Sequence, residues 1–405
     1  MLTKEKGPAE GMLENITVLD VGTMVAAPVA GTLMADFGAN VIKVEQPGTG
    51  DTLRGIGPHL EGESLWWHVD GRNKKSITLN LRTEKGQKIL KDLVRKSDVF
   101  LENFRPGTLD AWNIGYEVLS ELNPGLVMLS VSGFGQTGPL SNRAGYDRIG
   151  LAFGGVMALN GYPDRPPVRI ATSMADYFTA TLGAFAIMTA LHYRETNGGK
   201  GQQIDLALYE SIFRFTETLT AAYDRLGFVR QRTGNVHFAA APGNNYETID
   251  GRYITLTCSG NLIFKRLCLA MNRVDLMNDP SLATHKQRWE RIEELNQIVG
   301  DWIKSMPVDD VSAALDESGV PFSLALTIDE IIQHPHYEAR ENIVSVNHPT
   351  LGPIKMQGVI PKFSGVSGKK IEPAPSVGQH NEEIYLGFLG LSRDELGSLK
   401  KEGVI

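Results

Sequence analysis

The sequence predicts an α/β fold, with an open, doubly wound, mostly parallel sheet domain and a smaller α+β domain. Two observations lead to this prediction. From Ile16 to Val131, short β-branched runs alternate with helical stretches, as in βαβ units. Near residue 226 this alternation gives way to a Gly/Asn-rich passage, a hairpin and helices. We therefore expect a large domain at 12–225, a small domain at 226–335, and a segment at 336–405 that returns to the large domain.

The composition sets broad limits on function. The chain has 405 residues, of which 42% are hydrophobic and 21% charged, and this suits a soluble globular protein of two domains. Its net charge of -7 argues against nucleic acid as the main partner, because a phosphate backbone requires a basic face. Cys258 and Cys268 are too few for a disulfide framework. A reducing, cytoplasmic setting is expected, and no stretch approaches the ~20 apolar residues of a membrane span.

The first βαβ unit is expected at the beginning of the chain. Ile16–Val21 is a β-branched run, Pro28–Phe37 has a helical pattern ended by Gly38, and Val41–Glu45 is a second β-branched run. Proline near the start of a helix and glycine just past its end are typical helix boundaries. The two strands are therefore expected to be parallel, with a right-handed connection.

Two further helix–strand pairs continue this pattern. The helix Glu84–Lys96 leads to the strand Asp98–Glu102, and the helix Tyr116–Leu122 leads to the strand Leu126–Val131. In open parallel sheets, ligands bind at the carboxyl ends of the strands. The residues that follow each strand are therefore the first candidates for chemistry.

The later elements are predicted from periodicity and turn residues. An apolar helix that should be buried nearly all round is expected at 175–191, a helix beyond Tyr209 to about 223, a hairpin at 246–257, a mostly helical stretch at 264–315, a β-rich piece at 353–363 and a last helix at 381–389.

Cations gather after the second predicted strand. Arg72, Lys74, Lys75 and Arg82 fall within eleven residues of an acidic protein. This run is either a solvated basic turn or a site for phosphates, and the sequence leaves both open. The tripeptide Asn103–Arg105, after a later strand, adds a guanidinium and an aromatic face to the second interpretation.

The glycines of SGFGQTGP match G-x-G-x-x-G but lack its context. Gly133, Gly135 and Gly138 follow a late strand and lead into Pro139 and a polar loop, whereas a dinucleotide fingerprint opens a helix in the first βαβ unit. A nicotinamide site is therefore not expected. The nine histidines show no metal-ligand spacing, and no metal is expected.

Asp176 stands out because it lies in an apolar helix. A carboxylate that enters an apolar site loses hydration, which costs roughly several kcal/mol without compensation. It is either a residue of the first turn, stabilised by the helix N-terminus, or a nucleophile at the mouth of a cleft. The residues around it leave both roles open.

Several ordered motifs resemble the class III CoA-transferase family, also called CaiB/BaiF, which contains formyl-CoA:oxalate and crotonobetainyl-CoA:carnitine CoA-transferases. The similarity runs from about Leu19 to Leu391. It is carried by LMADFGANVIKVEQPGTGDTLR, NKKSITLNLRTEKG, DVFLENFRPG, SVSGFGQTGP, MADY and RETNGGKGQQIDLALYE.

The resemblance implies a Rossmann-like large domain built from both chain ends, a small domain and an interlocked homodimer. It implies that Asp176 is the nucleophile. The positions that match CoA contacts of the family are Val25, Ala26, Gln46, Leu79, Asn80, Leu81, Arg82, Asn103, Phe104 and Arg105. Gln46, Ala111 and Ser132 replace basic residues of some relatives, so Arg54, Lys74 or Lys75 could compensate at the phosphates.

The implied reaction moves CoA from an acyl-CoA to a free carboxylic acid through an aspartyl-acyl anhydride and a β-aspartyl-CoA thioester. Coenzyme A enters as a substrate, and no metal or redox cofactor is implied. Oxyanion donors are expected near Val25 and Ala26, with Gly243 and Asn244 of a shortened glycine loop as further candidates. Both succinate-like and carnitine-like acids remain open, and Arg143 or Arg169 could hold a distal carboxylate.

Two rival functions remain. An α-methylacyl-CoA racemase resembles the family, but its relatives carry a histidine where this chain has Tyr146. Tyrosine titrates near pH ~10, which suits α-proton transfer poorly at neutral pH. Tyr146 is therefore a substrate-site candidate or a packing residue. The third possibility, a non-catalytic CoA-binding subunit, is disfavoured by Asp176.

Overall fold

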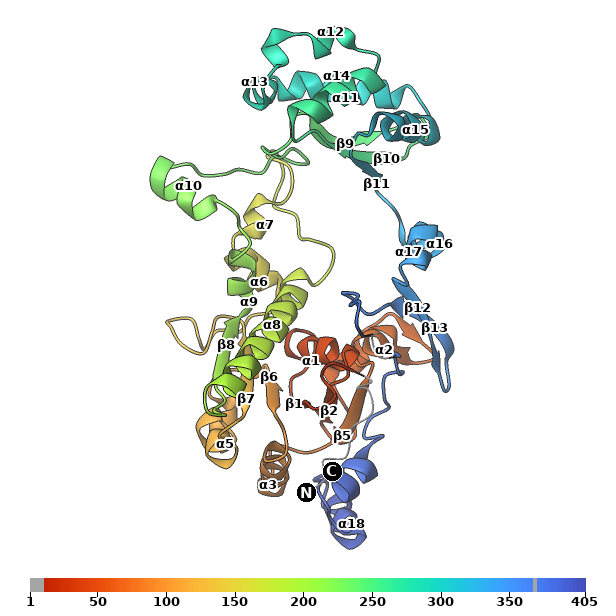
Figure 1. The fold of residues 1–405 in the computed structure, drawn as a ribbon. Coiled ribbons are helices and arrows are strands. Elements are labelled where there is room, and N and C mark those ends of the chain that lie inside the picture. Colours follow the sequence, from red (N-terminus) through yellow and green to blue (C-terminus); the bar gives the residue numbers. More distant parts are fainter. Residues whose placement is uncertain (1–10, 367–369) are drawn as a thin grey trace. The chain divides into compact units, whose positions relative to one another are not determined.

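The computed structural model describes residues 11–366 and 370–405 and divides the chain into two compact units. The large unit takes the chain up to Met157, then Arg169–Val229 and Glu338–Ile405. The small unit takes Ala158–Val168 and Arg230–Tyr337. The small unit is thus inserted into the chain of the large one (Figure 1).

A six-stranded sheet in which every neighbouring pair is parallel forms the centre of the large unit, and it confirms the predicted α/β class. In spatial order its strands are β5 (Lys74–Thr78), β2 (Asn40–Glu45), β1 (Thr17–Asp20), β6 (Val99–Glu102), β7 (Val127–Ser132) and β8 (Gln203–Ala207). The chain order reverses direction between β1 and β6, and ligands of open α/β sheets bind at such a switch point. Strands β5 and β8 were not predicted.

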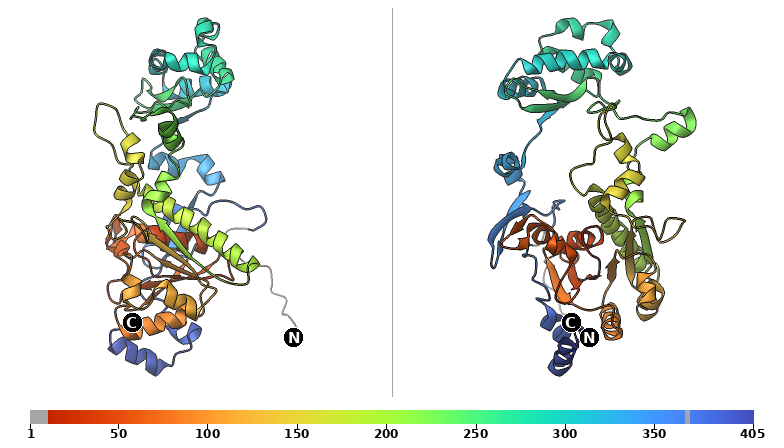
Figure 2. Two further views of the ribbon diagram at one scale, coloured as in Figure 1. Left: turned by 90° about the vertical axis from the view of Figure 1, so that its left-hand side faces the viewer. Right: turned by 180° about the vertical axis from the view of Figure 1, so that it is seen from behind.

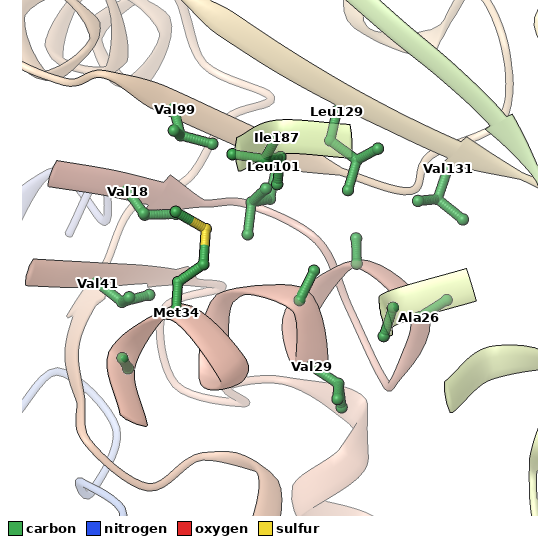
Figure 3. Close-up of a cluster of buried hydrophobic side chains, with 14 of the residues drawn as sticks. Val18, Ala26, Val29, Met34, Val41, Val99, Leu101, Leu129, Val131 and Ile187 are labelled. Atoms are coloured by element: carbon green, nitrogen blue, oxygen red, sulfur yellow. The ribbon is translucent and has the colours of Figure 1, made fainter. Parts of the chain in front are cut away.

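Each face of this sheet has its own core, because side chains alternate along the strands. Val18, Val99 and Leu129 contribute to the core under α1 (Ala26–Asp36) and α8 (Met174–Thr196), which Figure 3 shows. Leu19 and Phe100, one position along, contribute to the opposite core with α3 (Glu84–Val94) and α5 (Tyr116–Leu122). These alternating apolar side chains hold the strand ends, and the loops after them, in fixed positions.

The other elements of the large unit before residue 230 are short. They are α2 (Leu65–Asp70), α4 (Thr108–Ala111), α6 (Asp147–Phe153), α7 (Val156–Leu159, which reaches the unit boundary), α9 (Leu208–Phe213), α10 (Leu219–Leu226), the strand pair β3 (His59–Leu60) and β4 (Glu63–Ser64), and a 3-10 turn at Thr52–Gly55. The single helix expected beyond Tyr209 is therefore two helices.

The small unit has a three-stranded antiparallel sheet covered by helices on one face (Figure 2). Its strands are β9 (Gly243–Glu247), β10 (Tyr253–Thr257) and β11 (Phe322–Leu324), and its helices are α11 (Asn261–Ala270), α12 (Val274–Met277), α13 (His285–Glu290), α14 (Ile292–Lys304), α15 (Val308–Ser318), α16 (Ile328–Gln333) and α17 (Pro335–Ala339, which crosses the unit boundary). The predicted hairpin turn at Asp250–Gly251 is confirmed, and Gly251 has the positive φ of 77° that favours glycine.

The C-terminal segment runs along the outer edge of β5. The Ser76 amide donates to His380 Nδ1 at 3.1 Å, the Thr78 amide donates to Asn381 Oδ1 at 2.9 Å, and the Tyr385 hydroxyl donates to the Thr78 carbonyl at 2.6 Å. These bonds satisfy the polar groups of an otherwise open sheet edge. The segment also contains the hairpin β12 (Ile343–His348) and β13 (Gly352–Gln357), a π-helical turn at Glu383–Phe388 and α18 (Arg393–Lys401).

Two predictions for this segment need correction. The β-rich piece was placed at 353–363, but the hairpin begins ten residues earlier, at Ile343. The last helix of the described chain is α18, beyond the stretch 381–389. Helix α18 begins with a capping box in which Ser392 and Glu395 bond each other's amides, a local signal that the sequence analysis missed.

Helix α8 is buried on one side only, so the prediction that it is buried nearly all round is wrong for the single chain. It packs on α1, β7 and β8, while Phe185 is 69% exposed and Phe178 and Met188 are also exposed. Among the described helices it alone has the length and hydropathy to cross a membrane. Its packing against the sheet accounts for its inner apolar residues, as in a core helix of a soluble protein.

Candidate active site

A pocket of about 190 Å³ lies at the switch point of the sheet, beside the start of α8. The loops after three strands form most of its wall, as expected for ligand sites of parallel sheets. Its lining residues are Thr23–Ala26 after β1, Asn103–Pro106 after β6, Val131–Gly133 at the end of β7, Arg143–Tyr146, Asp176 and Leu208. Four predicted positions from distant parts of the chain, Val25, Asn103, Tyr146 and Asp176, are therefore brought together here.

Asp176 is the third residue of α8, yet it does not cap the helix. The carboxylate of Asp147 does so instead, because its Oδ1 accepts from the Ala175 amide at 2.8 Å. No donor among the described residues hydrogen-bonds the Asp176 side chain. The capping role that the sequence left open is thus filled by another residue, and the Asp176 carboxylate faces the pocket unpaired.

Burial, and then the negative charge of Asp147, raise the pKa of Asp176 to about 7, while Arg169 opposes the shift. Arg169 pairs with Asp147 at 3.2 Å and donates to the Ala171 carbonyl. It is therefore already engaged, whereas Arg143, the other candidate for a distal carboxylate, is exposed at the pocket wall.

The backbone of Val25 and Ala26 lies at the N-terminus of α1, where amides lack partners within the helix. Among the described residues neither amide has an acceptor, so both can donate to an oxyanion in the pocket. Thr23 and Met24 just before them are held in place. The Thr23 amide donates to Asn103 Oδ1 at 2.8 Å, and the Met24 amide donates to Asp51 Oδ1 at 3.0 Å.

Asp51 is a functional candidate that sequence reasoning missed. Met24 has a φ of 66°, which is strained for a residue with a side chain, and the bond to Asp51 fixes this conformation. Asp51 is buried and pairs with Lys43 at 2.9 Å. Its one sequence signal was its position in the GTGD loop after β2.

A second pocket of about 390 Å³ adjoins the first, since Thr23 and Phe104 line both. Its wall holds several of the positions expected to contact CoA, namely Gln46, Leu79, Leu81, Arg82 and Phe104, together with Trp112 and the Thr49–Thr52 loop. Asn80 lies between them but uses its amide to bond the Val404 carbonyl, and its side chain accepts from the Arg82 amide.

Lys74 and Arg54 do not fit the role of phosphate ligands proposed for them. Lys74 is buried in strand β5, where its ammonium donates to Asp20 at 2.9 Å and to the Pro28 carbonyl. Arg54 forms two bonds to Glu45, at 2.7 and 2.8 Å, and stacks on the Trp67 ring. Both cations neutralise buried carboxylates. A run of charged residues in the sequence does not reveal such pairs, because it does not show the partners.

The other cations differ in how they are engaged. Lys75 is partly exposed but pairs with Glu383 at 2.7 Å. Arg82 and Arg105 are exposed, and neither has an ion pair or side-chain hydrogen bond to another described residue. Arg105 lines the pocket of Asp176 and Arg82 lines the adjoining one, so these two guanidinium groups remain available to a phosphate.

Tyr146 is 74% exposed and lines the Asp176 pocket, so it is not a buried packing residue. Of the glycines in the G-x-G-x-x-G match, Gly133 serves close packing, since a Cβ added to it would lie 2.6 Å from Gly145 Cα. No helix begins directly after them, and the dinucleotide interpretation stays disfavoured.

Gly243 and Asn244 lie in strand β9 of the small unit, so the expected glycine loop is a strand there. The Gly243 amide donates to Asn296 Oδ1 at 3.2 Å, and its neighbour across the hairpin is Thr257. The Gly243 amide is therefore engaged within the small unit.

Comparisons with known proteins agree with these features. The profile of CoA-transferase family III matches residues 13–381. The chain is 45% identical to succinyl-CoA–D-citramalate CoA-transferase of Chloroflexus aurantiacus over 97% of this chain and 98% of that protein. It is 39% identical to the succinyl-CoA–L-malate CoA-transferase beta subunit of the same organism, over the same shares. A crystal structure of a CaiB/BaiF family protein from Brucella suis superposes with a TM-score of 0.82 at 32% identity, covering 93% of this chain and 99% of that one.

Proposed function

This chain belongs to CoA-transferase family III and is a CoA-transferase, and we propose that Asp176 is the nucleophile that carries CoA between two carboxylic acids. The observation that carries this proposal is an unpaired carboxylate, with a pKa raised to about 7, in a pocket with two free amides. A carboxylate that is poorly solvated and close to a thioester gains reactivity.

In each step of the proposed reaction, the bond that forms is matched by a bond that breaks. An Asp176 oxygen attacks the acyl-CoA carbonyl carbon, the C–S bond breaks, and a mixed anhydride and the CoA thiolate result. The thiolate attacks the aspartyl carbonyl, which releases the first acid and leaves a β-aspartyl-CoA thioester. The second acid attacks that thioester to form a new anhydride, and the released thiolate then attacks its acyl carbonyl. The new acyl-CoA leaves, and Asp176 is regenerated.

The tetrahedral intermediates of these steps develop negative charge on oxygen. The Val25 and Ala26 amides are suited to stabilise it, because their positions are fixed before the reaction by the helix and by the bonds to Thr23 and Met24. Donors that are already oriented lose little free energy to reorganisation during the reaction.

We propose succinyl-CoA as a donor and a small hydroxy-dicarboxylate as the acceptor. Both relatives described above are named for succinyl-CoA and for citramalate or malate, which favours the succinate-like acids over the carnitine-like ones. Arg143, exposed at the pocket wall, is the candidate for the distal carboxylate. The racemase alternative is not favoured, since both of these relatives are named as CoA-transferases.

Intact mass after brief incubation with succinyl-CoA, acetyl-CoA and a branched acyl-CoA tests the proposal. The wild type should gain one CoA adduct that hydroxylamine removes, and Asp176→Asn should gain none. Asp164→Asn, a change of an exposed aspartate, is the matched control and should behave as the wild type. If no donor gives an adduct and the branched substrate exchanges its α-proton with deuterium, the racemase replaces the transferase.

The exposed guanidinium groups predict how CoA is bound. Arg105→Gln and Arg82→Gln should each raise the KM for acyl-CoA by about 10-fold or more, because each loses a charge-assisted bond to a phosphate. The value of kcat should change less. Steady-state kinetics with succinyl-CoA measures both, and Arg95→Gln, which removes an exposed pair on α3, should leave both unchanged. Unchanged KM values in both variants would contradict this assignment.

We also propose that the protein is a homodimer, as the resemblance implied. The exposed face of α8 carries three large apolar side chains, Phe178, Phe185 and Met188, and neighbouring exposed apolar side chains of this kind often mark a protein–protein interface. Light scattering after size exclusion should give the dimer mass for the wild type and a smaller mass for Phe185→Glu. Leu262→Glu, at an exposed leucine of the small unit, should stay dimeric. A wild-type monomer at micromolar concentration would refute the proposal.

A further inference from the structure

Two histidines that are 280 positions apart in the sequence meet in the large unit. His68 lies in α2 and His348 at the end of β12, and their ring centroids are 4.5 Å apart with the planes inclined by 63°. Glu63 of β4 completes the group. One ring nitrogen of each histidine and one carboxylate oxygen of Glu63 all lie within 4.8 Å of one another. The histidine spacing in the sequence gave no sign of this cluster.

His68 lacks the partners that a buried imidazole normally has. The residue is 2% exposed, yet neither Nδ1 nor Nε2 forms a hydrogen bond of acceptable geometry with another residue that the structure describes. Nε2 does lie 3.1 Å from Glu63 Oε2, a separation that suits an ion pair or two ligands of one ion. A buried polar group without hydrogen bonds costs about 1–3 kcal/mol, so this arrangement requires an explanation.

We propose that Glu63, His68 and His348 bind a divalent transition-metal ion of the zinc type. Two imidazoles and a carboxylate are a common donor set for zinc, which leaves a further position for water. Ligands that bind one zinc ion at about 2.0–2.1 Å lie about 3.3 Å apart in tetrahedral geometry. The separation of 3.1 Å between His68 Nε2 and Glu63 Oε2 is close to that value. The Glu63 side chain is 44% exposed, so the ion has a route from solvent.

The surroundings of both rings fit this role. Neither ring nitrogen of His68 is taken up by a hydrogen bond to another described residue, so one of them can bind an ion. Thr350 Oγ1 lies 3.1 Å from His348 Nδ1, so its oxygen can accept the proton that moves to Nδ1 when an ion binds Nε2. The amides of Thr350 and Leu351 also approach Nδ1, at 3.4 and 3.3 Å, and favour the other tautomer until an ion binds.

The ion would join segments from the two ends of the large unit, so its effect is expected on stability. It would tie α2 to the β12–β13 hairpin, and a ligand that binds only the folded state raises the unfolding temperature. This inference does not depend on the proposed reaction.

Titration of the metal-free full chain with Zn²⁺ by calorimetry, and with Co²⁺ by its visible absorption, tests the site. The wild type should bind one ion per chain and unfold at a higher temperature with Zn²⁺. Glu63→Gln, at a partly exposed position where the fold should be retained, is expected to bind about 100-fold more weakly, and Thr350→Val about 10-fold more weakly. His59→Gln, on the adjacent strand β3, is the matched control and should bind as the wild type.

Two outcomes would overturn the proposal. One is equal binding by the wild type, Glu63→Gln and His59→Gln, which would place the ion elsewhere on the surface. The other is the absence of a saturable Co²⁺ absorption band and of any Zn²⁺ effect on the unfolding temperature of the wild type.

Discussion

Asp176→Asn is expected to lower the rate of CoA transfer by on the order of 10⁴-fold or more, because an amide cannot form the anhydride or the thioester. Two further consequences follow from burial, which raises the pKa of Asp176 to about 7. Only the ionised carboxylate attacks, so kcat/KM of the wild type for acyl-CoA should rise with pH through about 7 and then level off. Initial rates between pH 5.5 and 8.5 measure this profile.

The same pKa also predicts a gain in stability for the variant. The folded state holds the Asp176 proton up to about pH 7, whereas the unfolded chain releases it near its ordinary pKa of 3.8. The folded protein therefore loses stability as the pH rises between these values. Thermal unfolding should show Asp176→Asn to be more stable than the wild type at pH 8 and equal to it near pH 4.

Burial also raises the pKa of Glu102 to about 7. Its contribution to the pH dependence of stability is the same in the wild type and in Asp176→Asn, so it cancels when the two are compared. Near-normal activity of Asp176→Asn would remove Asp176 from the nucleophile role. An active-site carboxylate that merely supports the fold would instead give a variant that is less stable at every pH.

Lys43→Met is expected to destabilise the large unit by about 3–5 kcal/mol, because it leaves buried carboxylates without their cation. The Lys43 ammonium is 1% exposed and lies 2.9 Å from Asp51 and 3.6 Å from Asp20. Burial alone lowers the pKa of Lys43, but the carboxylates of Asp20, Asp51 and Glu45 outweigh it and hold the pKa above its ordinary value. Urea unfolding at pH 7.5 measures the loss.

The matched control is Lys75→Met, on the neighbouring strand β5, where Lys75 lies opposite Ile42, the residue before Lys43. Its pair with Glu383 is partly exposed, so the change should cost at most about 1 kcal/mol. The double variant Lys43→Met, Asp51→Asn should recover part of the lost stability, since it removes one of the unpaired charges. Equal effects of the Lys43 and Lys75 changes would show that the buried pair contributes no more than a surface pair.

Local signals were enough to predict the core of the large unit. Leu19, Val41 and Phe100 lie in β-branched or apolar runs separated by helices with clear boundaries, and such runs predict buried parallel strands. Strand β5 was missed because two lysines and a serine precede its single apolar residue, Ile77. Lys74 is tolerated there because Asp20, 54 positions earlier, pairs with it. No window of the sequence contains both partners.

In the candidate site too, local features could be predicted and contacts between distant residues could not. The position of Asp176 near the start of an apolar helix could be predicted, and the motifs after β1 and β6 pointed to the pocket wall. The role of Asp147 could not be predicted, since it depends on a bond to the Ala175 amide across 28 positions. The exposed side of α8 was missed for a related reason. An apolar helix pattern does not distinguish burial within one chain from burial by a second.

The bonds between β5 and the end of the chain have a consequence for synthesis. Ser76 and His380 are separated by 304 positions, which a ribosome takes about 15–60 s to translate. During that time the outer edge of β5 has no partner, although every residue of the inserted small unit is translated before His380. The nascent large unit thus carries an open strand edge, prone to wrong pairing, until its last residues arrive. Proteolysis of nascent chains stopped short of His380 should cut the large unit and spare the small one.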